Sequence, residues 1–156
     1  MSNIRHLLVA TDGSPDSLKA AKLAGDLARG FGARVTVLMV QSEDVVVPHA
    51  WGAGDFPADM PSGLMPVEEI RAMLEQRARE EELRNTAAAI GELPSTPELV
   101  HRWGHVAAEI CGFAAGHEVD MIVLGSHGRS GLKRVLLGSV SRAVANDARC
   151  PVIISR

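Results

Sequence analysis

Three glycines near the end of the chain have the spacing of a loop that holds an anion. The stretch Gly125-x2-Gly128-x9-Gly138 follows the apolar run 121–124, and a helical pattern begins at Ser139. Glycine lets the backbone approach a ligand closely and adopt positive φ without penalty. Ser139 can cap the following helix, whose first N–H groups and dipole favour a negative group. We therefore expect an anion here, and a triphosphate suits the loop better than a neutral metabolite.

This spacing resembles the nucleotide-binding signature of the universal stress proteins, in the subgroup that binds ATP. The resemblance implies ATP as the ligand, accompanied by a divalent ion such as Mg²⁺ that water and phosphate oxygens mostly hold. The residues that it places around the nucleotide in this part of the chain are Gly125, Ser126, Gly128, Arg129, Gly138, Ser139, Val140 and Ser141. On spacing alone, the alternative that the glycines only make turns stays open.

Asp12 follows the first apolar segment, at the place where open α/β sheets bind their ligands. An aspartate in such a position can also serve the turn itself, by accepting hydrogen bonds from nearby N–H groups. The resemblance favours contact with the nucleoside, because Ala10, Thr11 and Asp12 fit the first-strand pattern of the family. It also implies that the backbone of Val40 reads the adenine edge.

Apolar runs alternate with helical patterns along the chain, which predicts a parallel sheet with helices on both faces. Strands are expected at 4–10, 35–40, 98–102, 121–124 and 152–155, and helices at 15–31, 67–92, 139–147 and after Gly104-His105. The fold class is therefore α/β, a Rossmann-like open sheet of five strands. The resemblance implies the strand order 3-2-1-4-5, which sets the ends of the first and fourth strands side by side.

Local signals predict how two of the helices sit. The first should begin with Ser14 as its N-cap and Pro15 at the first helical position. Its predicted buried face, read from helical spacing, comprises Ala20, Ala24, Leu27 and Phe31. In the long helix, the charged run 75–82 is predicted to be a solvated face.

The chain of 156 residues fits one domain, 1–156. Within it, residues 41–66 are rich in proline and glycine and have no sustained period, which is typical of a functional or mobile loop. The stretch resembles the variable insertion of the family. Its Trp51 and Phe56 could cover the nucleotide or a partner, or could anchor the loop to the domain surface.

Composition excludes several classes of protein. The net charge is −3 with both signs interspersed, which argues against a nucleic-acid partner. Cys111 and Cys150 show no CxxC spacing and are predicted to be reduced core thiols of a cytoplasmic protein. The N-terminal apolar run 7–10 is too short for a signal peptide. No run approaches the roughly 20 apolar residues of a membrane span, so no membrane partner is expected.

Two functional hypotheses of different class follow. In the first, the protein is an ATP-binding regulator, a homodimer paired through its last strand, which an unidentified protein partner reads. In the second, the same site is a slow ATP hydrolase or phosphotransferase, which needs a base or a water-orienting group. Asp12 and His127 are the candidates, and the default reading of His127 is a solvent-facing loop residue. No catalytic residue is assigned, and another adenine-containing ligand is a third possibility.

Overall fold

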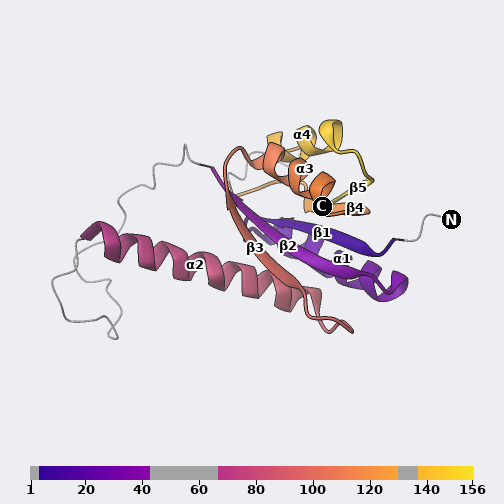
Figure 1. The fold of residues 1–156 in the computed structure, drawn as a ribbon, viewed down its shortest axis with the longest axis horizontal. Coiled ribbons are helices and arrows are strands. Elements are labelled where there is room, and N and C mark those ends of the chain that lie inside the picture. Colours follow the sequence, from indigo (N-terminus) through magenta and orange to yellow (C-terminus); the bar gives the residue numbers. More distant parts are fainter. Residues whose placement is uncertain (1–3, 43–66, 130–136) are drawn as a thin grey trace.

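A five-stranded parallel sheet forms the centre of the molecule, with α1 and α2 on one face and α3 and α4 on the other (Figure 1). The computed structural model describes residues 4–42, 67–129 and 137–156. The elements are β1 (His6–Thr11), α1 (Pro15–Phe31), β2 (Arg34–Gln41), α2 (Val67–Ile90), β3 (Glu98–Trp103), α3 (Val106–Gly116), β4 (Met121–Gly125), α4 (Ser139–Asp147) and β5 (Val152–Ser155). The strand order is β3-β2-β1-β4-β5 and every neighbouring pair is parallel. The predicted fold class and strand order are therefore confirmed, and the predicted strand bounds agree within two residues.

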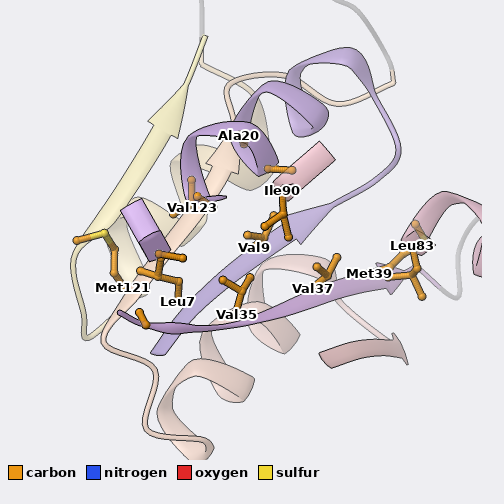
Figure 2. Close-up of a cluster of buried hydrophobic side chains, with 14 residues drawn as sticks. Leu7, Val9, Ala20, Val35, Val37, Met39, Leu83, Ile90, Met121 and Val123 are labelled. Carbon is orange, nitrogen blue, oxygen red and sulfur yellow. The ribbon is translucent and has the colours of Figure 1, made fainter. Parts of the chain in front are cut away.

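The central strands are apolar at nearly every position because their side chains feed two cores in alternation. Leu7 and Val9 of β1 belong to the core under α1 and α2 (Figure 2). Leu8 and Ala10 belong to the core under α3 and α4. Burying one such large aliphatic side chain stabilises the fold by about 1.5–3 kcal/mol. A parallel sheet covered on both faces requires this pattern.

The first helix begins as predicted, but one residue of its expected buried face is exposed. The hydroxyl of Ser14 caps the helix by accepting from the N–H of Ser17 at 3.3 Å. The buried stripe consists of small residues, namely Ser17, Ala20, Ala21, Ala24, Gly25 and Ala28. A Cβ at Gly25 would lie 2.0 Å from the carbonyl oxygen of Ile90, so the stripe is set by the close approach of α2. Phe31 continues the spacing of this stripe into the last turn but is 48% exposed, so its predicted burial is wrong.

The long helix α2 ends at Ile90 rather than at residue 92, because Gly91 takes a left-handed conformation with φ 80°. The predicted solvated face 75–82 is correct for four exposed residues, Gln76, Arg77, Ala78 and Glu81, whereas the other four are half-buried, and two of these make contacts beyond the helix. The guanidinium of Arg79 lies 5.1 Å from the ring centroid of Trp103. Glu82, with a side chain only 30% exposed, forms an ion pair with Arg129.

The two cysteines and the end of β2 differ from expectation. Cys111 and Cys150 are half-buried rather than fully buried, and burial raises the pKa of both thiols. Gln41, expected to open the variable loop, is the last residue of β2. Trp51 and Phe56 lie outside the described residues. Among the helices that the structure describes, none is long and apolar enough to cross a membrane.

Candidate functional site

A pocket of about 280 Å³ lies at the carboxyl ends of β1 and β4. These strands pair directly, with Ala10 opposite Leu124. From β1 the chain adds β2 and β3 on one side, and from β4 it adds β5 on the other side. Open α/β sheets bind ligands at this switch point because the two following loops diverge and leave a crevice. The topology therefore brings Asp12 and the glycine segment together, although more than 100 residues separate them in the sequence.

The pocket contains all but one of the residues that the sequence analysis singled out. Those that line it are Ala10, Thr11, Asp12, Val40, Gly125, Gly128, Arg129, Gly138, Ser139, Val140 and Ser141. Ser126 does not line it and is 2% exposed. The Ser126 hydroxyl donates to Asp16 at 3.1 Å, and its carbonyl accepts from the N–H of Gly138 at 2.8 Å. Ser126 therefore stabilises the glycine segment through bonds to α1 and to Gly138 and does not face the pocket.

The sequence analysis missed several lining residues, and its default reading of His127 as a solvent-facing loop residue is wrong, since this side chain is only 20% exposed. The additional lining residues are Ser17, Leu38, Val106, Ile110, Leu124 and His127. The aliphatic members carry no local signal, because a side chain that lines a pocket and one that fills a core have the same spacing on an element. They could be located only from the strand order, which places the ends of β2, β1 and β4 side by side, with Val40 and Gly125 marking those ends.

The pocket has two chemically different sides. Its inner wall is aliphatic and comprises Leu38, Val40, Val106, Ile110 and Leu124. Its rim is polar and carries Asp12, Arg129 and the first turn of α4. An apolar wall beside a charged rim fits a ligand that has a flat or apolar part and an anionic part.

Asp12 ties the turn after β1 to the glycine segment. Its Oδ1 accepts from the N–H of Ser14 and its Oδ2 from the N–H of Arg129, both at 3.0 Å. The alternative reading of Asp12 as a turn aspartate is thus confirmed for the Ser14 bond. Since Asp12 also lines the pocket, the carboxylate is in place to meet a ligand without leaving the turn.

The three glycines of the motif are needed for close approach and not for positive φ. None of Gly125, Gly128 and Gly138 has a left-handed φ, which corrects one part of the sequence argument. A Cβ at Gly125 would lie 2.8 Å from the backbone carbon of Asp16, and one at Gly138 would lie 3.0 Å from the carbonyl oxygen of Ser126. A Cβ at Gly128 would lie 2.7 Å from Oδ2 of Asp12. A side chain at Gly125 would push β4 away from the start of α1, and one at Gly138 would push the start of α4 away from Ser126, whereas one at Gly128 would displace the Asp12 carboxylate or the loop.

The helix α4 begins one residue earlier than its expected cap implies. The N-cap is Gly138, so the helix has no side-chain cap bond. Ser139 is its first helical residue, and its predicted role as the cap is wrong. The Ser141 hydroxyl donates to the carbonyl of Gly125 at 2.7 Å, which fastens the helix to the end of β4. The first N–H groups of a helix have no partner within it, and here Ser139, Val140 and Ser141 line the pocket. The helix dipole at this end favours an anion.

His127 lines the pocket, and its ring is oriented by Asp16 of α1 and by the adjacent Ser126. Its Nδ1 lies 2.9 Å from the Ser126 hydroxyl and 3.5 Å from a carboxylate oxygen of Asp16. Burial by itself would raise the pKa of Asp16, but hydrogen bonds from Ser126 and Lys19 outweigh it and hold the pKa below its ordinary value. Asp16 therefore stays ionised beside the ring, an arrangement that fixes the orientation of the imidazole.

Comparison with known proteins connects the chain to one family. The sequence model of the universal stress protein family matches residues 3–156. The universal stress protein YxiE of Bacillus subtilis (strain 168) is 35% identical over 151 residues, which cover 96% of this chain and 97% of that protein. UspA from Lactobacillus plantarum superposes with a TM-score of 0.77 at 23% identity over 100% of both chains, a likeness of fold. The structure of a universal stress protein in complex with cAMP gives a TM-score of 0.59 at 25% identity, covering 99% of this chain and 98% of that one.

Proposed function

The chain belongs to the universal stress protein family, and on that basis we propose that it binds ATP between β1 and β4 and acts as a homodimeric, nucleotide-responsive regulator. The observation that carries the proposal is the combination, in one pocket, of an aliphatic wall with a rim of glycines, Arg129 and a helix N-terminus. The adenine would lie against Val40, the ribose near Asp12, and the phosphates along Gly128 and the first turn of α4.

One argument favours an adenine base, and a second favours several phosphates. A member of the family with a matching fold has been solved with cAMP, an adenine nucleotide. The guanidinium of Arg129 and the dipole of α4 supply positive potential at the rim, and both gain more from a polyphosphate than from a neutral ligand. Another adenine-containing ligand would use the same wall with fewer rim contacts.

Mg²⁺ would enter the site with the phosphates rather than through a cage of protein ligands. Among the described residues there is no group of three or more His, Cys, Asp or Glu side chains that could hold a metal ion. Mg²⁺ keeps several waters and commonly binds through substrate phosphates with one or two carboxylates. Asp12, at the rim beside Gly128, is the carboxylate best placed to contribute.

The proposed dimer would form through β5, which is the outer strand next to β4. The carbonyl of Pro151 accepts from the N–H of Ile122 in β4, and that of Ser155 accepts from the N–H of Ser126 just after β4. Because successive residues of a strand face opposite sides, the N–H groups of Val152 and Ile154 face the open edge. An unpaired edge of this kind is a template for a second strand.

The test is the identity and affinity of the bound nucleotide. Mass spectrometry of the purified protein should find an adenine nucleotide, and calorimetry with Mg²⁺ should find ATP bound at least about tenfold more tightly than GTP, about 1.4 kcal/mol. GTP is the matched control because it brings the same phosphates with a different base. Equal affinity for ATP and GTP would contradict the base contact at Val40, and no binding of either would end the proposal.

A second candidate function, slow hydrolysis of the same ATP, rests on His127. A catalytic base needs a partner that orients it, and Asp16 and Ser126 lie at Nδ1 of His127. We expect turnover slower than about one per minute, against roughly 1–1000 per second for typical enzymes, because a fast hydrolase would erase the state that it signals. A rate near one per second that His127→Ala abolishes, while ATP still binds, would establish the enzyme instead.

A further inference from the structure

Arg129 is shared between the pocket and a helix that does not reach the pocket. Its guanidinium pairs with the carboxylate of Glu82 in α2, while its backbone N–H donates to Asp12 at 3.0 Å. Arg129 lines the pocket and Glu82 does not. The side chain that offers positive charge to a ligand is therefore already engaged by α2.

This ion pair lies across the turn that follows β1. A Cβ added to Gly13 would lie 2.9 Å from Nη2 of Arg129 and 3.1 Å from the side-chain carboxyl carbon of Glu82. Gly13 has φ 76°, so both the conformation and the space reserve this position for glycine. The pair thus packs directly over the backbone that carries Asp12.

Contacts between α2 and the sheet fix the position of Glu82 beside Arg129. Thr86, one turn further along α2, is fully buried, and its hydroxyl lies 2.9 Å from that of Thr11 at the end of β1. The same hydroxyl donates to the carbonyl of Glu82 at 2.9 Å. Leu83, beside Glu82, packs into the core (Figure 2). The backbone around Glu82 is therefore fixed by the buried residues Leu83 and Thr86, and this places the carboxylate beside Arg129.

We propose that the Arg129–Glu82 pair is a latch by which phosphate in the pocket is reported to α2. A phosphate that engages the guanidinium competes with Glu82 for it, since both are anions and Arg129 is the charge that they share. When the ligand prevails, Glu82 loses its partner and the contact between α2 and the glycine segment is released. In Figure 1, α2 extends beyond the sheet, so the latch would connect the pocket to a helix that reaches away from it. This inference rests on the proposed ATP site and specifies how that site is regulated.

The latch predicts an effect that depends on phosphate. Arg129 and Glu82 are 61% and 30% exposed, so solvent screens the pair and its loss should change affinity only about two- to fivefold. Glu82→Gln should strengthen ATP binding by that factor and leave adenosine binding unchanged. Glu81→Gln is the matched control, because it removes the same charge from the neighbouring, exposed position of the same helix.

Calorimetry with ATP and adenosine on the wild type, Glu82→Gln, Glu81→Gln, Arg129→Gln and the Glu82→Gln/Arg129→Gln double variant decides the matter. The latch requires the gain to disappear in the double variant, because no guanidinium remains to be released. In NMR spectra of the wild type, the side-chain carboxyl carbon of Glu82 should shift with ATP and not with adenosine. The latch is refuted if Glu82→Gln behaves as Glu81→Gln, weakens ATP, or changes ATP and adenosine alike while the wild type binds ATP. Failure of both the wild type and Glu82→Gln to bind ATP would overturn the proposed function itself.

Discussion

Replacing Gly128 with alanine tests the site with a single methyl group. The new Cβ would lie 2.7 Å from Oδ2 of Asp12, below the 3.0 Å at which real Cβ contacts essentially stop. The carboxylate must move by several tenths of an ångström or the loop must lift. Oδ2 is also the acceptor for the N–H of Arg129 at 3.0 Å. The substitution therefore loosens the bond that joins the two halves of the pocket rim.

The magnitude follows from what is lost. Hydrogen bonds to charged groups contribute about 1.5–3 kcal/mol, but the bond between Asp12 and Arg129 lies at the surface, so we expect a stability loss near 1 kcal/mol. For a chain of this size that lowers the melting temperature by about 2–4 °C. ATP affinity should fall at least about tenfold, or about 1.4 kcal/mol, because Asp12 and the loop are both displaced.

Calorimetry with ATP and thermal melts by circular dichroism measure the two effects separately. Gly112→Ala in α3 is the control, since a Cβ there meets nothing within 4 Å and should leave ATP affinity unchanged. If the clash acts through the carboxylate, Gly128→Ala should cost little in a protein that already carries Asp12→Ala. A folded Gly128→Ala variant with wild-type ATP affinity would refute the assignment of this loop to the site.

Three further predictions concern association, acid stability and turnover. Ile154→Pro should shift the protein from dimer to monomer in light scattering, because it removes an N–H at the open edge of β5; Ile154→Val keeps that N–H and should stay dimeric. Burial, aided by the charge of Arg34, lowers the pKa of His6 below its ordinary 6.5. The unfolded chain then takes up the proton first, so denaturant-measured stability should fall as pH drops below about 6.5. His6→Gln should flatten that slope, and exposed His105→Gln should not. His127→Ala should leave the residual ATP turnover within about a few-fold, and a complete loss would favour the enzyme.

The elements of this fold could be predicted because each carries a local signal. Buried strands appear as short apolar runs, and Ser14-Pro15 marks the start of α1 through a cap that depends only on neighbouring residues. The strand order could not be read from those runs. It came from the resemblance to the family, and the observed pairing of β1 with β4 agrees with it.

Predictions failed where the deciding contact is distant in sequence. The burial of Phe31 was inferred from its spacing along the helix, but spacing does not show which turns other elements cover. Gly25 packs against the backbone at Ile90, whereas Phe31 in the last turn is left 48% exposed. Glu82 lies in a run of charged residues, and nothing in the sequence distinguishes it from its neighbours. Only the packing of α2 beside β1 and the glycine segment brings Glu82 to Arg129. A pairwise contact over 47 residues, such as that between Glu82 and Arg129, leaves no mark on the local pattern.

The structure also changes the physical meaning of the motif that the sequence displays. Its glycines do not supply unusual dihedrals; they let the loop touch Asp12, Asp16 and the strand ends. The Ser141 hydroxyl is bonded to Gly125 and the Ser126 hydroxyl to Asp16, so neither is the evident phosphate donor that a hydroxyl in such a motif implies. Among the described residues, the groups of this rim best suited to an anion are the backbone N–H groups at the start of α4, whose positions the loop fixes, and the guanidinium of Arg129. Among the described residues, Arg129 is a charged group of the rim that already has a partner outside the pocket, so under the proposed latch a response to ligand charge would pass through it to α2.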